Sequence, residues 1–108
     1  MGQITDLAKE IHQIAVEHGW WPQPANFGDP VNGRSFGDII ALIHSEASEA
    51  LEAYREHKSI DSVGEEFADI IIRVLDACVG YGIDIETALT KKVSYNKTRP
   101  YRHGNKRL

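Results

Sequence analysis

Four acidic residues stand in two pairs that share one spacing. Glu46 and Glu49 are three positions apart, and after a gap of sixteen residues Glu66 and Asp69 repeat the interval. On a helix, residues three apart lie on one face, so each pair presents two carboxylates side by side. Carboxylate oxygens are ligands that hard cations prefer, and the chain has no cysteine pair to favour a softer metal. The two pairs therefore indicate a site for Mg²⁺, with Mn²⁺ as the alternative.

Glu46 is the most unusual of the four because of its neighbours. At about 100° per residue, Ile39, Ile43 and Ala50 fall within roughly 60° of it on a helical wheel. The carboxylate thus stands inside the apolar face, where an ionised group without a partner is costly. Acidic pairs are common on solvated helix surfaces, and that explanation would suffice for one pair. Two pairs, each at the edge of an apolar face, favour convergence of all four acids on one cation.

A di-iron site is the competing metal interpretation. Di-iron bundles need Glu-x-x-His on two helices, and no histidine follows any of the four acids at that spacing. Magnesium, in contrast, is usually held by a few carboxylates together with water and substrate phosphates. The set of acids is therefore more typical of a site for a phosphate-bearing substrate.

The elements that must position these acids are helices. Apolar residues recur at intervals of three and four near the N-terminus and through both acidic segments, and no alternation of period two is sustained. The sequence predicts a single all-α domain, with Asp61 and Asp84 as N-caps and with Gly19 and the glycines around Tyr81 as helix stops. The expected elements are helices over residues 1–18, 36–57, 61–81 and 84–99, a loop over 19–35 and a basic tail over 100–108.

Charge is distributed unevenly along the chain. All 16 acidic residues lie at or before Glu86, whereas seven of the 12 lysines and arginines follow residue 90. The basic tail suits a phosphate or a nucleic acid, and it equally suits neutralisation of the chain's own acidic body. A single cysteine excludes an internal disulfide framework, and neither a signal peptide nor a membrane span is recognisable. We expect a cytoplasmic protein.

The acidic pattern, taken with two longer stretches, resembles a known superfamily. The stretches are SEASEALEAYR around the first pair and EEFADIIIRVLDACVGYGIDIETAL around the second. Together they are similar to the MazG-like all-α nucleoside triphosphate pyrophosphohydrolases, a superfamily that includes dimeric all-α dUTPases and dCTP pyrophosphatases. The resemblance covers residues 36–99. It implies a four-helix MazG-like bundle that is completed by oligomerisation.

The resemblance also implies a reaction and its residues. A (deoxy)nucleoside triphosphate would be hydrolysed to the monophosphate and pyrophosphate by a Mg²⁺-dependent hydrolase. Glu46, Glu49, Glu66 and Asp69 would be the metal ligands, and either Glu46 or Glu49 would act as the general base. The enzyme would be a homodimer or a dimer of dimers, with sites at subunit contacts.

Substrate contacts are expected from two further places. Lys92, Asn96 and Arg99 share one face of the fourth predicted helix, where the family carries groups that contact phosphate. Trp21, in a loop that also holds Trp20, Asn26 and Phe27, is a candidate for stacking on the base. The alternative for both tryptophans is that they cover the core.

A different class of function stays open at this point. The chain would then be a non-enzymatic helical interaction module, or a nucleic-acid-binding module that uses the basic tail, although no helix-turn-helix signature is present. His44 and Ser48 resemble a nucleophile pair only superficially, because both lie nearly opposite Glu46 on the wheel and no G-x-S-x-G motif accompanies them. We expect them on the surface, and Cys78 in the core.

Overall fold

The computed structural model describes residues 2–21 and 35–101, and these contain four α-helices and no strand. The helices are α1 (Gln3–Glu17), α2 (Phe36–Arg55), α3 (Ile60–Tyr81) and α4 (Ile85–Thr98). The all-α prediction is confirmed. Most of the predicted loop, including Asn26 and Phe27, and the end of the predicted tail lie outside the described residues.

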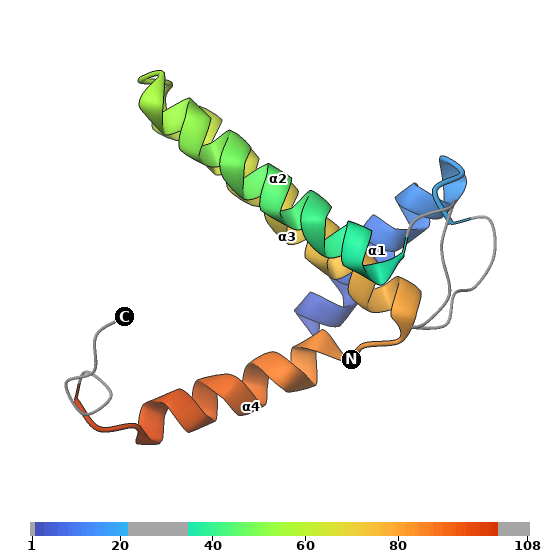
Figure 1. Cartoon of the computed structure of the whole chain (residues 1–108). Coiled ribbons are helices and arrows are strands. Elements are labelled where there is room, and N and C mark those ends of the chain that lie inside the picture. Colours follow the sequence, from blue (N-terminus) through green and yellow to red (C-terminus); the bar gives the residue numbers. More distant parts are fainter. Residues whose placement is uncertain (1, 22–34, 102–108) are drawn as a thin grey trace.

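The four helices form a packed group of three and an outlying fourth. Helices α2 and α3 run side by side as a long antiparallel pair, and α1 packs across α3 near one end of this pair (Figure 1). Helix α4 leaves that end and points away from the pair, and its main packing partner is α1. The two acid-bearing helices are therefore held together over their whole length.

The helix starts follow from short polar side chains. Ser35 accepts a hydrogen bond from the backbone N–H of Asp38, and the Asp38 carboxylate accepts one from the Ser35 N–H, which forms a capping box on α2. Asp84 caps α4 as predicted, accepting from the Thr87 N–H. The prediction that Asp61 caps α3 is wrong. Ser59 is the N-cap, and Asp61 lies in the first turn, where its charge is favourable beside the helix N-terminus.

The helix ends lie where the backbone turns left-handed. Gly19 follows α1 with φ 83°, and Gly82 ends α3 with φ 74°, a region that glycine adopts without steric cost. Both predicted stops are confirmed. His57 also has a positive φ of 58°, so α2 ends at Arg55, two residues before its predicted end.

The core lies where α1, α2 and α3 meet. Its buried members are Trp21, Ile39, Ala77 and Tyr81. The Trp21 and Tyr81 rings pack in a T-shaped arrangement with their centroids 5.4 Å apart. Gly80 makes room for Trp21, because a Cβ at that position would collide with the indole ring. Cys78 is also buried, as expected.

Helix α4 is joined to the rest through its first turn. The Glu86 carboxylate accepts a hydrogen bond from the backbone N–H of Thr5 at 2.9 Å and so caps α1 from outside. Gly2 supplies no side-chain cap of its own, and a Cβ there would collide with Glu86. Beyond this turn α4 has no buried residue.

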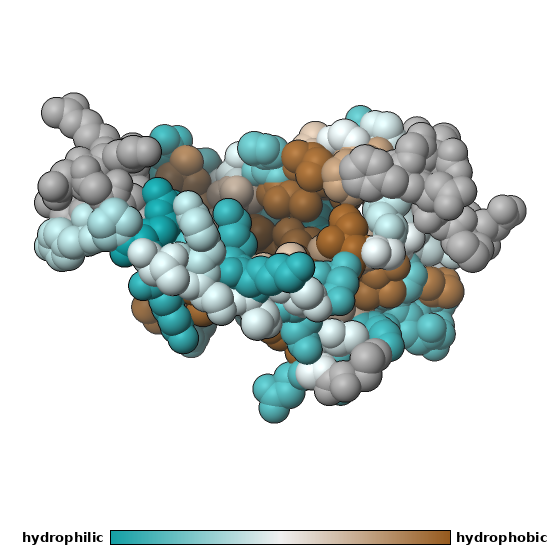
Figure 2. Space-filling view, turned by 90° about the horizontal axis from the view of Figure 1, so that it is seen from below, coloured by the Kyte–Doolittle hydropathy of each residue, from teal (hydrophilic) through white to brown (hydrophobic). Residues whose placement is uncertain are grey.

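Several large apolar side chains remain exposed on α3 and α4. Phe67 and Ile71 are 56% and 55% exposed, and Leu89 and Val93 are 41% and 51% exposed. Figure 2 shows hydrophobic surface gathered in the middle of one face, with hydrophilic side chains to either side. None of the helices in the described part of the chain is long and apolar enough to cross a membrane.

Candidate metal centre

Three of the four predicted ligands come together in the structure. Carboxylate oxygens of Glu46 on α2 and of Glu66 and Asp69 on α3 all lie within 4.8 Å of one another. The helical spacing places Glu66 and Asp69 on one face of α3, and the packing of α2 against α3 brings Glu46 to that face. Glu46 is 9% exposed, in agreement with its place on the apolar side of α2.

Glu49 belongs to the same group through its electrostatics. A hydrogen bond with Glu46 raises the pKa of Glu49, and the charge of Glu46, burial, and the charges of Glu66 and Asp69 raise it further. The structure thus brings Glu46, Glu66 and Asp69 into one acidic cluster, whereas Glu49 is an exposed neighbour one turn after Glu46 that the oxygen distances do not include.

Arg73 supplies one positive charge to this acidic cluster. Its Nε donates to Glu46 Oε1 at 2.8 Å, and this hydrogen bond lowers the pKa of Glu46, with burial acting in the opposite direction. One guanidinium cannot balance four carboxyl groups.

The cluster fits a small hard cation. Two oxygens bound to one Mg²⁺ are about 3 Å apart when adjacent and about 4 Å apart when opposite. The oxygens of the acidic cluster, all within 4.8 Å of one another, are close to that spacing. A divalent cation would also relieve the repulsion among the acids, and an all-oxygen donor set suits Mg²⁺ or Mn²⁺.

A pocket of about 430 Å³ opens directly beside the acidic cluster and shares Glu46 and Asp69 with it. One wall comes from α1 and the residues that follow it, and the other wall comes from α3. Apolar and aromatic side chains dominate the lining, with charged groups toward the acidic cluster. The lining includes Ile11, Ile14, His18, Trp20, Ile72, Arg73 and Asp76.

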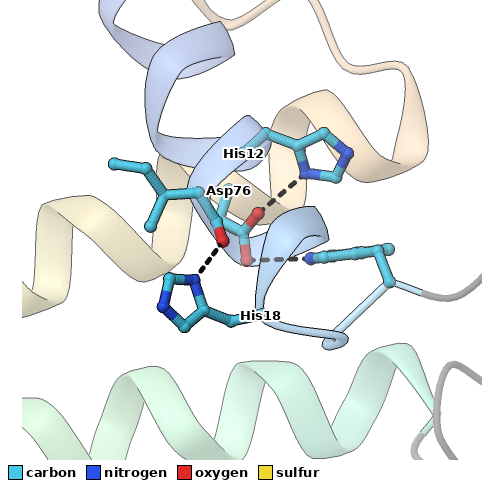
Figure 3. Close-up of polar contacts among 5 residues, drawn as sticks. His12, His18 and Asp76 are labelled. Carbon is cyan, nitrogen blue, oxygen red and sulfur yellow. Dashed lines mark hydrogen bonds and ion pairs between the residues drawn. The ribbon is translucent and has the colours of Figure 1, made fainter.

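Asp76 is held rigidly at this pocket by two donors. His12 Nδ1 donates to its Oδ1 at 2.8 Å, and Trp21 Nε1 donates to its Oδ2 at 3.0 Å. Figure 3 shows the contact between His12 and Asp76, with His18 nearby. His18 Nδ1 donates to the Ile14 carbonyl oxygen at 2.8 Å. The polar groups of this region are therefore fixed in orientation.

The substrate-binding residues predicted on the fourth helix do not line this pocket. Lys92 and Asn96 are exposed on α4, and Arg99 is partly buried just beyond its end. Lys92 and Arg99 each approach the Tyr95 ring, at 5.7 Å from its centroid. These groups present positive charge on a helix that points away from the α2–α3 pair (Figure 1).

The two tryptophans have different surroundings. Trp21 is 8% exposed and packs in the core, whereas Trp20 is 56% exposed and lines the pocket. The structure thus places Trp21, the predicted stacking residue, behind the pocket wall, where its indole N–H orients Asp76.

Sequence reasoning did not identify the polar group around Asp76. Asp76 is seven residues after Asp69, and the sequence therefore predicts that it continues the acidic line on the same face of α3. Nothing in the sequence linked it to His12 or Trp21, because these contacts depend on how α1 packs across α3. His44 and Ser48 are exposed, as expected.

Comparisons of the chain with protein-family models, with curated proteins and with solved structures found no match.

Proposed function

We propose that this protein is a Mg²⁺-dependent pyrophosphohydrolase that converts a nucleoside triphosphate to the monophosphate and pyrophosphate. The observation that carries the proposal is the approach of Glu46, Glu66 and Asp69 to within 4.8 Å from two packed helices. The pKa of Glu49 is raised by these three acids and by burial, which supports a surplus of negative charge at this place. An acidic cluster that suits a cation, next to a pocket, is the arrangement such a hydrolase needs.

The surroundings of each acidic residue decide which role in the reaction we assign to it. Glu66 and Asp69, with Glu46, would hold Mg²⁺, which when bound offsets phosphate charge and lowers the pKa of a bound water. Glu46 is nearly buried and engaged by Arg73, so it is a poor candidate for moving protons. Glu49 is exposed and has a raised pKa, which suits a general base that takes a proton from the attacking water. Of the two glutamates that the sequence leaves open, we favour Glu49.

The basic groups of α4 complete the proposed site from a second copy of the chain. Lys92 and Asn96 are exposed on a helix that packs mainly against α1, and they do not line the pocket beside the acidic cluster. Exposed apolar residues on both α3 and α4, including Phe67 and Val93, offer surface for association. A homodimer or a dimer of dimers would cover this surface and bring positive charge to the triphosphate.

The direct test is hydrolysis of a panel of ribo- and deoxyribonucleoside triphosphates with Mg²⁺ or Mn²⁺, with monophosphate and pyrophosphate as the measured products. We expect pyrophosphate from the wild-type protein and a loss of at least about 100-fold in Asp69→Asn, the scale for removing a group that stabilises transition-state charge. Asp61→Asn is the matched control, because Asp61 is an exposed aspartate of the same helix outside the acidic cluster. It should retain full activity.

Two results would overturn the proposal. One is the absence of pyrophosphate release from every nucleotide with either metal. The other is activity that persists unchanged in Asp69→Asn. Salt-sensitive binding of nucleic acid that survives Asp69→Asn and disappears on truncation after Pro100 would support the rival binding module instead.

A further inference from the structure

We propose that the pocket beside the acidic cluster binds the nucleobase and that Asp76 selects bases that carry an amino group. This inference rests on the proposed function, because it concerns the substrate of the same site. The pocket shares Glu46 and Asp69 with the acidic cluster, so a nucleotide whose phosphates meet the cation has its base within reach of the pocket. At about 430 Å³ the pocket is within the range of small-molecule sites.

The walls of the pocket suit a flat heterocycle. Ile14 from α1 and Ile72 from α3 contribute apolar surface on opposite sides, and Trp20 adds an aromatic ring. Aromatic and aliphatic side chains pack against the faces of a base without distinguishing one base from another. Discrimination must therefore come from polar groups that meet the edge of the base.

Asp76 is the polar group best placed for this task. Its side chain is 22% exposed and lines the pocket, and each of its oxygens already accepts one N–H, from His12 and from Trp21. A carboxylate oxygen has two lone pairs, so both oxygens can accept a further hydrogen bond. Because both donors come from packed rings, the carboxylate cannot rotate freely to suit a different ligand.

His18 presents an acceptor as well. The Ile14 carbonyl can only accept, so the hydrogen of neutral His18 lies on Nδ1 and the lone pair lies on Nε2. Asp76 and His18 both line the pocket, and both offer acceptors to a ligand. Arg73 also lines the pocket, but its Nε donates to Glu46 in the acidic cluster, so the edge of a base that meets Asp76 and His18 must donate.

Bases differ in the edge that they can present to such a group. Guanine offers N1–H and an amino group side by side, which matches the two oxygens of a carboxylate. Cytosine and adenine offer an amino group. Uracil and thymine offer one N–H between two carbonyl oxygens, and these oxygens would face the Asp76 carboxylate. Carbonyl oxygens that face a partly buried carboxylate are unfavourable, so guanine should rank first and uracil and thymine last.

The first test is the ratio of kcat/KM for dGTP, dCTP and dATP to kcat/KM for dUTP and dTTP. For the wild-type protein we expect a ratio of about tenfold or more, the scale of a hydrogen bond to a charged group. In Asp76→Asn the ratio should fall toward one, because the amide N–H repels an amino group and can donate to a carbonyl. The variant should fold, since the asparagine oxygen can accept from Trp21 and its N–H can donate to His12 in the other tautomer.

Trp21→Phe is the control for a purely structural role. It removes one donor to Asp76, keeps an aromatic ring in the core and leaves both carboxylate oxygens able to accept. If Asp76 acts only by holding α1 to α3, both variants should lower stability and neither should change the ratio. That outcome would overturn the inference, as would a wild-type preference for dUTP or dTTP.

A binding test without metal separates this inference from the proposed function. Guanosine, cytidine and uridine lack phosphates, so their binding does not depend on the acidic cluster or on hydrolysis. In ¹H–¹⁵N spectra we expect guanosine and cytidine to shift the Trp20 and Trp21 indole signals more than uridine does, and Asp76→Asn to remove the difference. Equal responses or no response to the three nucleosides would contradict the inference, even in a protein that releases pyrophosphate.

Discussion

Helix α3 carries two kinds of acidic site about two turns apart. Asp76 accepts hydrogen bonds from His12 and Trp21 at 2.8 and 3.0 Å, so the protein itself supplies the partners of this carboxylate. Glu66 and Asp69 instead lie beside another carboxylate, that of Glu46, and among the described residues Arg73 is the ion-pair partner of Glu46. The carboxylate of Asp76 thus has hydrogen-bond donors as partners, whereas negative charge is left in excess at the acidic cluster.

The difference separates an acid whose hydrogen-bond donors the protein supplies from acids that, in our proposal, bind a cation. Unpartnered like charges lower stability, and they are kept where binding of a cation offsets the cost. The Asp76 group orders the junction of α1 and α3, whereas the acidic cluster adds repulsion between α2 and α3. Removing charge should therefore have opposite effects on stability at the two places.

The largest expected effect is on catalysis. Glu66→Gln should reduce pyrophosphate release by about 100-fold or more, since it removes one member of the triad that would hold the cation. Its free energy of unfolding without divalent cation should be unchanged or slightly higher, because a like charge is gone. Pyrophosphate assays and urea unfolding measure the two quantities. A variant that loses activity only by losing its helical structure would break the comparison.

At the satisfied site, Asp76→Leu should lower the free energy of unfolding by about 1–3 kcal/mol, the cost of leaving partly buried donors without an acceptor. Urea unfolding followed by circular dichroism measures the change. The near-isosteric Asp76→Asn is the control and should lose less, because it retains an acceptor for Trp21. Equal stability of Asp76→Leu and the wild type would show that the hydrogen bonds add nothing to the α1–α3 junction.

The packing behind Asp76 gives a third prediction. Gly80→Ala should destabilise the protein by about 1–3 kcal/mol, because the added Cβ meets the rigid Trp21 ring. Gly64→Ala on the same helix is the matched control, since nothing lies within 4 Å of its Cβ position. That change should stabilise α3 by about 0.5–1 kcal/mol. Both values can be read from urea titrations, and a stabilised Gly80→Ala variant would contradict the packing described.

The smallest effect concerns the pH dependence of stability. Glu49 has a pKa raised above 4.5 in the folded protein, so its contribution to stability is fully present below 4.5 and is lost as the pH rises through the folded value. Without divalent cation, unfolding midpoints in urea should therefore increase as the pH is lowered toward 4.5. The pKa of Glu46 is lowered, so its contribution to stability is lost only as the pH falls below 4.5. The effects of the two glutamates on stability therefore fall in different pH ranges. Glu49→Gln should flatten this part of the profile, and an unchanged slope would argue against the raised pKa of Glu49.

The helices were predictable because their signals are local. Apolar periodicity, the glycine stops and the Asp84 cap are read directly from neighbouring residues, and the structure confirms them. The start of α3 was missed because Ser59 and Asp61 are both good caps, and the choice between them depends on backbone conformation outside the helix. The direction of α4 had no local signal either, since it depends on the contact between Glu86 and the first turn of α1.

The acidic cluster was predictable for the same reason that α2 and α3 were. Each pair lies on one face of its helix, and packing of two consecutive antiparallel helices through these faces brings the two pairs close together. The Arg73–Glu46 ion pair and the anchoring of Asp76 required the packing of three helices, which a single sequence does not give. The pocket between α1 and α3 was missed because its walls come from residues far apart in the chain.

Titration of the protein with Mn²⁺, followed by electron paramagnetic resonance of the free ion, tests the central claim most directly. We predict saturable binding by the wild-type protein, strong loss of binding in Glu66→Gln and Asp69→Asn, and normal binding in Asp61→Asn. Mn²⁺ that stays free in the presence of the wild-type protein, or that binds equally to all four proteins, would contradict the account.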